Sequence, residues 1–191
     1  MSGHGFHVHG PHHHEVEHVV HHGGDQFTGK VAVITAVLST VGAIFGYMGG
    51  HTQNLALMYK NDAAIQKTAA SNQWSYYQAK SNKQNLAEVA ASLTTGEGRD
   101  GFRQAVERYK TEKNEIKATA EKFDVAAEES EKKSAEELHT HEKWALATTL
   151  IQVSIALGAI VLLTKRRWML GAVYGFSGVG IVVGVMALLH S

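Results

Sequence analysis

Three long runs of the chain are apolar and carry no charged residue. They cover residues 31–48, 145–163 and 168–189, and a helix of about 18 to 20 apolar residues crosses the roughly 30 Å hydrocarbon core of a membrane. The alternative, buried helices of a water-soluble protein, needs a larger surrounding core than the polar middle of the chain supplies. We therefore expect an all-α protein with three transmembrane helices.

Between the first two runs lies a long polar stretch that we expect to form an antiparallel helical hairpin outside the membrane. Its two arms, residues 52–94 and 102–143, lack proline and are rich in Ala, Lys, Glu and Gln, as long helices are. Three glycines at positions 96, 98 and 101 separate the arms, and Asp100 is placed to cap the second one. The expected segments are a tail (1–29), a first span (30–50), the hairpin (51–144, with its turn near 95–101), a second span (145–164) and a third span (168–190).

Apolar residues recur at alternating spacings of three and four in both arms, which predicts an imperfect coiled-coil seam. In the first arm this seam includes Met58, Ile65, Tyr76, Leu86 and Leu93. In the second arm it includes Ile116, Ala120, Phe123, Ala127 and Ser134. A turn centred on Glu97 and Gly98 would then place Lys60 beside Glu136, Lys67 beside Glu128 and Lys80 beside Glu115.

The stretch SNQWSYYQAKS, residues 71–81, raises the question of what its aromatic side chains contact. With Tyr76 in the seam, a rotation of about 100° per residue turns Trp74 away from the second arm. Trp74 then begins a second stripe whose small members allow close approach of another helix, and we predict that a second copy of the chain covers it. The alternative is a tryptophan exposed to solvent. The predicted contact residues are Ala63, Ala70, Trp74, Tyr77 and Ser81.

Glycines four residues apart recur in the first and third spans, a spacing that permits close contact between helices in lipid. They can pack the three spans of one chain or join separate copies, and we favour a homo-oligomer. The residues concerned are Gly42, Gly46, Gly50, Gly171, Gly175, Gly180 and Gly184.

Charge distribution predicts the orientation in the membrane. Short loops rich in Lys and Arg stay on the cytoplasmic side, which applies to Lys165, Arg166 and Arg167 between the last two runs. We therefore expect an inner-membrane protein with this loop and the N-terminal tail in the cytoplasm and the hairpin outside it. The 18 basic and 18 acidic residues cancel, so no basic surface for nucleic acid is expected.

The motif Trp-x-Tyr-Tyr-Gln-Ala-Lys at residues 74–80 resembles the bacterial domain-of-unknown-function family 4337. The resemblance extends to the preceding NDAAIQKTAA, the glycine-rich first span, the histidine-rich leader and the KRRW sequence before the last span. Members of this family are small membrane proteins with the same expected layout. The resemblance implies an architecture and no activity.

The tail is the first of two candidate metal sites, because imidazole nitrogens are ligands for zinc, nickel and copper. Weak binding of these ions is expected, with sensing, buffering or an incidental tag-like property all open, and protonation would draw the tail toward anionic lipid. The second candidate, at the hairpin base, is a zinc site made by His51, His141 and Glu137, with solvated histidines as the alternative. The tail residues are His12, His13, His14, His18, His21 and His22.

The sequence contains no cysteine and none of the common catalytic motifs, so we do not expect an enzyme or a required cofactor. No Asp, Glu, Lys, Arg or His lies in the three apolar runs 31–48, 145–163 and 168–189, which disfavours a coupled transporter. The expected function is a self-associating structural or interaction protein of the membrane, with protein partners undefined. A metal-responsive or pH-responsive protein is the alternative, and a passive pore lined by Thr35, Ser39, Thr40 or Gln152 is a third.

Overall fold

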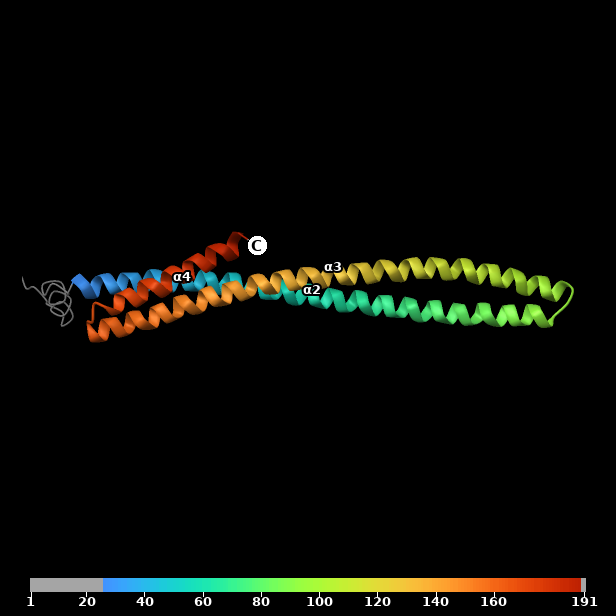
Figure 1. The fold of residues 1–191 in the computed structure, drawn as a ribbon, viewed down its shortest axis with the longest axis horizontal. Helices are drawn as coiled ribbons and strands as arrows, with labels where there is room; N and C mark the ends of the chain where they lie inside the picture. Colours follow the sequence, from blue (N-terminus) through green and yellow to red (C-terminus); the bar gives the residue numbers. More distant parts are fainter. Residues whose placement is uncertain (1–25, 190–191) are drawn as a thin grey trace, which may run out of the picture. The chain divides into compact units, whose positions relative to one another are not determined.

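The computed structural model describes residues 26–189, which form three α-helices (Figure 1). Helix α2 covers Gln26–Leu93, α3 covers Glu97–Thr164 and α4 covers Met169–Leu189. The expectation of an all-α chain is confirmed, and each helix is long and apolar enough to cross a membrane. The first two expected spans are not separate helices, because each continues without a break into one arm of the hairpin.

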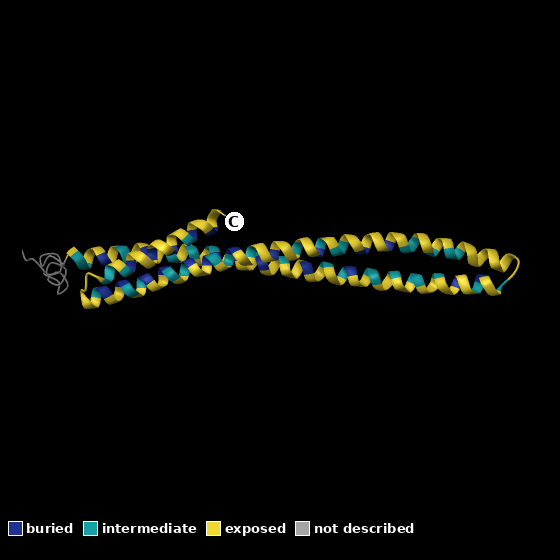
Figure 2. Cartoon of the chain, in the orientation of Figure 1, coloured by how far each residue is buried: buried dark blue, intermediate teal, exposed yellow. Residues whose placement is uncertain are grey.

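The chain divides into two units, both crossed by α2 and α3. The membrane-type unit consists of residues 26–49 and 142–189 of the described chain, and the hairpin unit consists of residues 50–141. Within the hairpin unit α2 and α3 run antiparallel, and their buried residues alternate with long exposed faces (Figure 2).

In the hairpin unit the buried face of α2 is a row of alanines rather than the predicted seam of larger residues. Ala56, Ala63, Ala70 and Ala91 are at most 9% exposed and lie at multiples of seven residues from one another, the repeat of a left-handed coiled coil. Across from them, the predicted seam of α3 is confirmed at its centre, where Ile116, Ala120, Ala127 and Ser134 are buried.

The predicted seam of α2 is therefore wrong, and the physical reason is close approach. The Ser134 hydroxyl donates a hydrogen bond of 2.8 Å to the backbone carbonyl of Ala56 on the other helix. So short a side chain reaches the neighbouring backbone only because no larger group stands between the two helices. Facing small residues bring the two backbones together, and the bulkier side chains of α2 are left on other faces.

The turn also differs from the expectation. Helix α2 ends at Leu93 and α3 begins at Glu97, so Gly98, Asp100 and Gly101 lie inside the second helix, and Asp100 lies in its first turn instead of capping it. Gly96 alone of the three glycines has a positive φ, of 67°, and its carbonyl accepts a hydrogen bond from the Arg99 amide at 3.0 Å.

The earlier turn shifts the pairing of the arms by about one helical turn. Lys60 pairs with Glu131 at 2.7 Å, Lys67 with Asp124 at 3.4 Å and Lys80 with Glu112 at 2.5 Å. The partners predicted from the sequence lie three to five residues further along α3. Those predicted pairs are wrong because the chain reverses before Glu97 rather than between Glu97 and Gly98.

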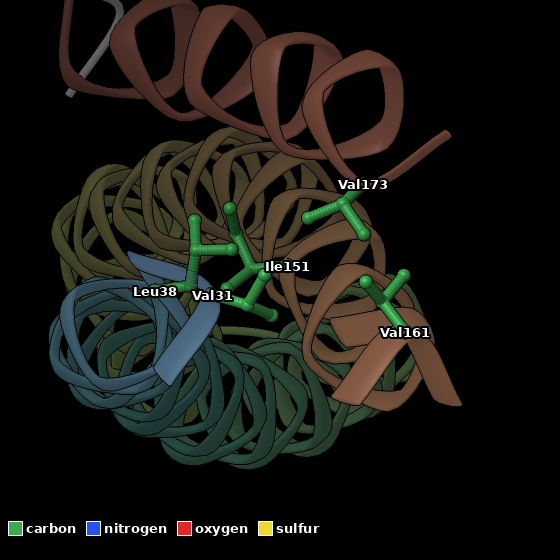
Figure 3. Close-up of a cluster of buried hydrophobic side chains, with 5 residues drawn as sticks. All are labelled: Val31, Leu38, Ile151, Val161 and Val173. Carbon is green, nitrogen blue, oxygen red and sulfur yellow. The ribbon is translucent and has the colours of Figure 1, made fainter. Parts of the chain in front are cut away.

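The membrane-type unit has a small apolar core to which all three helices contribute. Figure 3 shows Val31 and Leu38 of α2, Ile151 and Val161 of α3, and Val173 of α4, all at most 6% exposed. Helix α3 is followed by a left-handed residue, Lys165, with φ of 54°, whose amide donates to the Val161 carbonyl at 2.8 Å. This cap lets the chain reverse into α4 within a few residues.

Replacing glycines on the two sides of the hairpin turn tests the observed boundaries. Gly96→Ala places a side chain on a left-handed backbone and should destabilise the hairpin by about 1 to 2 kcal/mol. Gly101→Ala should stabilise it by about 0.5 to 1 kcal/mol, because Gly101 is helical and a methyl group there meets no atom within 4 Å. Thermal unfolding followed by circular dichroism in detergent measures both, and equal effects of the two changes would contradict this turn.

Candidate functional site

Side chains of the motif Trp74 to Lys80 join the two arms of the hairpin by a hydrogen bond and an ion pair. The Trp74 indole N–H donates to Asp124 Oδ2 at 2.8 Å, and the other oxygen of that carboxylate, Oδ1, pairs with Lys67. Trp74 also contacts Tyr77 edge-on, with ring centroids 5.7 Å apart. The prediction that Trp74 faces away from the second arm is wrong.

The orientation error has a single cause. The prediction puts Tyr76 in the seam, whereas Tyr76 is 50% exposed and Ala70 is 1% exposed. The helix is therefore rotated so that the stripe containing Trp74 faces α3 within one chain. Ala63 and Ala70 are buried there, and Tyr77 and Ser81 are half-buried. We do not assign this stripe to contact between copies.

Lys80 makes the second contact between the motif and the other arm. Its ammonium group pairs with Glu112 and lies 5.2 Å from the ring centre of Tyr76 and 5.6 Å from that of Tyr109. The hydrogen bond from Lys80 lowers the pKa of Glu112, and the same bond, supported by one to Tyr76, raises the pKa of Lys80. Lys113 completes the cluster by lying 5.3 Å from the ring centre of Tyr77. Cations over aromatic faces add to the ion pairs across the arms.

The glycines predicted to mediate contact between copies fall into two groups. A methyl group at Gly42 would lie 3.1 Å from Ile151 Cγ2, one at Gly180 would lie 3.1 Å from Leu150 Cβ, and one at Gly184 would lie 2.5 Å from Phe45 Cζ. These three glycines pack helices of one chain, the alternative that the sequence left open. At the remaining four a methyl group meets no atom within 4 Å, and they are Gly46, Gly50, Gly171 and Gly175.

The predicted zinc site at the hairpin base does not form. Within residues 26–189, no three His, Cys, Asp or Glu side chains lie close enough together to hold a metal ion, so His51, His141 and Glu137 are not brought into one cluster. Thr52 occupies the buried position, at 3% exposed, and its neighbour His51 points outward. The predicted metal-binding tail, His12 to His22, lies outside the described residues.

The residues of α2 predicted to face the second arm form instead an uncovered surface beside the alanine row. Met58, Ile65, Leu86 and Leu93 are 50%, 56%, 70% and 82% exposed and keep a seven-residue phase. We call these four residues, with Asn72 and Ala79 in the same phase, the outer stripe. Two heptad patterns share this helix and only one can face α3, and the sequence analysis assigns the wrong one to that face.

The contacts of Asp124 with Trp74 and Lys67 should make the stability of the hairpin depend on pH. The Trp74 hydrogen bond, with a smaller contribution from Lys67, lowers the pKa of Asp124. A lowered carboxyl pKa stabilises the fold above the unfolded pKa of about 4, and this contribution is lost as the pH falls through the folded pKa. Trp74→Phe removes the N–H donor together with part of the ring, and it should lower the melting temperature at pH 7 by a few degrees. It should also make the additional fall in melting temperature between pH 5 and 3 smaller, because that fall reports the lost hydrogen bond.

The matched control is Glu128→Gln, which removes a neighbouring carboxylate of the same helix and should leave the melting temperature and its acid dependence close to those of the unchanged chain. Melting curves at each pH from circular dichroism in detergent provide the comparison. Equal acid sensitivity of Trp74→Phe and the unchanged chain would show that this hydrogen bond does not hold the arms together.

Comparison with known proteins identifies the chain by family alone. No curated protein and no solved structure matches it. The family model described as "Domain of unknown function (DUF4337)" matches residues 27–190 of the 191 residues. This confirms the resemblance carried by the motif at residues 74–80, although the match leaves out the histidine-rich leader. The chain therefore belongs to the DUF4337 family.

Proposed function

We propose that this protein is a structural or interaction protein of the membrane that anchors through its three apolar helices and self-associates through the outer stripe of α2. One observation carries the proposal. The hairpin buries its small residues and leaves a regular row of large apolar residues uncovered. A two-helix hairpin that acted alone in water would place these residues the other way round.

The composition of the membrane-type unit supports anchoring in lipid. Its core is small, and many of its large apolar side chains point outward, including Val33 and Val37 on α2, Leu163 on α3 and Val182 on α4, all more than half exposed. Soluble proteins rarely expose apolar surface on so many sides. In a bilayer the same surface faces hydrocarbon and needs no protein partner.

A second copy of the chain is the occupant that best suits the outer stripe. Two copies inserted in one membrane with the same orientation bring identical residues to the same level. Helices α2 of both copies then run parallel, and Asn72 meets Asn72 in the middle of an otherwise apolar row. A single Asn in such a row sets the register and the number of strands in parallel coiled coils.

The expected free energies favour contact between two outer stripes, although two charged residues lie beside each stripe. Asp62 and Lys83 are exposed and follow the same repeat, and a pair of charges that stays in contact with solvent changes the free energy by about 0 to 1 kcal/mol. Covering the exposed part of Met58, Ile65, Leu86 and Leu93 contributes about 1 kcal/mol for each side chain. The apolar contribution is larger, and the resulting contact is strengthened further by confinement of both copies to one membrane.

The pore and metal-response alternatives receive no support from the described residues. The hydroxyls of Thr35, Ser39 and Thr40 donate to carbonyls of their own helix at 2.9, 2.9 and 3.2 Å, so they need no water-filled channel. The metal-response alternative depends on the tail, outside residues 26–189. We keep self-association as the proposed function.

Introducing charge into the outer stripe tests self-association. The double change Ile65→Lys and Leu86→Lys should dissociate the oligomer, because it places ammonium groups in the proposed contact. Val125→Lys is the control, since Val125 is 65% exposed on α3 and outside the stripe. Native mass spectrometry or light scattering in mild detergent gives the oligomer mass, and a mass unaffected by the double change would refute the proposed contact.

Cysteine labelling tests the proposed orientation in the membrane. The chain has no cysteine of its own, so each introduced thiol reports one position. Thr95→Cys, in the exposed hairpin turn, should react with a membrane-impermeant maleimide in intact cells, whereas Arg166→Cys should react only after lysis. The reverse pattern would place the hairpin in the cytoplasm.

A further inference from the structure

One end of the membrane-type unit carries a group of cations beside an apolar groove. The connection between α3 and α4 contains Lys165, Arg166 and Arg167, and Lys30 lies near the start of α2. The Arg167 guanidinium lies 5.5 Å from the ring centre of Phe27, one helical turn before Lys30. This contact brings the cationic connection to the start of α2.

The groove lies between the first turns of α2 and the start of α4 and has a volume of about 550 Å³. Its walls are Val33 and Ile34 from α2 and Leu170 and Tyr174 from α4, and Lys30 borders the same space. Gly29 contributes no side chain, and a methyl group there would meet no atom within 4 Å. The groove therefore combines an apolar trough with a positive charge on its border.

Among the described residues of this unit, no carboxylate lies at the cationic end. Among its described residues, 26–49 and 142–189, the one carboxylate is Glu142, which lies about 35 Å away along α3 at 1.5 Å per residue. No ion pair joins Lys30, Arg166 or Arg167 to another described residue. These three side chains are exposed, so their charges are available to an anion.

We propose that this groove binds one anionic phospholipid, with its phosphate between Lys30 and Arg167 and an acyl chain along Ile34, Leu170 and Tyr174. A free anion would use the cations and leave the apolar trough empty, whereas a phospholipid uses both. Basic positions at the ends of membrane helices are known to favour anionic headgroups. Trp168, 72% exposed beside the cations, belongs to the residue type that prefers the headgroup level. The inference rests on the proposed location in a membrane.

Native mass spectrometry of the full chain in detergent tests the binding. The probes are phosphatidylglycerol and phosphatidylcholine with identical acyl chains. We expect phosphatidylglycerol to be retained more strongly, and each of Lys30→Gln and Arg167→Gln to weaken its retention by roughly fivefold, as expected for removal of one cation near the headgroup. Lys143→Gln is the control for charge alone, because Lys143 is next to Glu142, far from the groove, and should have no effect.

A second pair of variants tests the apolar part of the site without altering charge. Gly29→Phe fills the groove and should abolish selective retention, whereas Gly46→Phe adds the same side chain to an open position of the same helix and should not. Glycerol 3-phosphate, which lacks acyl chains, should not displace the lipid. Displacement by glycerol 3-phosphate, or full retention by Gly29→Phe, would overturn the lipid assignment in favour of a simple anion contact.

The remaining outcomes separate this inference from the proposed function. A chain that stays in the aqueous fraction without detergent would refute the membrane location itself. A membrane-bound chain that retains both lipids equally would refute only the anionic site. Loss of selective retention on deletion of residues 1–22 would assign lipid binding to the histidine-rich tail. This result too would refute the proposal that the groove binds the lipid.

Discussion

The close approach of α2 and α3 through small residues is the constraint on which the hairpin depends. Ala63 and Ala70 on α2 and Ala120 and Ala127 on α3 are all buried, and the Ser134 hydroxyl reaches a carbonyl of the opposite helix. Small side chains on both helices let the backbones come near each other, and that closeness determines which faces turn inward. The larger apolar residues of α2 are consequently left outside.

An alanine interface has an energetic consequence for the rest of the hairpin. Burying an alanine removes far less apolar surface from water than burying a leucine, because stabilisation scales with the area buried. Specific side-chain contacts between the arms therefore matter more. The family motif provides two of them, the hydrogen bond of Trp74 to Asp124 and the ion pair of Lys80 with Glu112. A partly exposed hydrogen bond or ion pair of this kind contributes on the order of 1 kcal/mol, so these contacts fix the register more than they add stability. A hairpin built this way gains from a neighbour, which is the physical basis for proposing self-association.

The membrane-type unit uses small residues in the same manner. Gly42, Gly180 and Gly184 lie where a methyl group would approach a neighbouring side chain within about 3 Å, so they allow the three helices of one chain to pack. In lipid there is little hydrophobic drive between helices, and packing of this kind supplies the association energy. The larger apolar side chains then cover the outside, and the cations gather at one end of the unit, where the groove opens.

The sequence by itself determined the helical class, the apolar segments and the position of the chain reversal to within a few residues, because these depend on local composition and on the length of apolar runs. It also drew attention to the motif around Trp74. Tertiary structure alone decided the face of α2 that meets α3, the partner of Trp74 and the roles of the individual glycines. Two heptad stripes, one through Ala70 and one through Ile65, share a single helix. Spacing cannot choose between them, because the choice depends on how closely the second helix can approach.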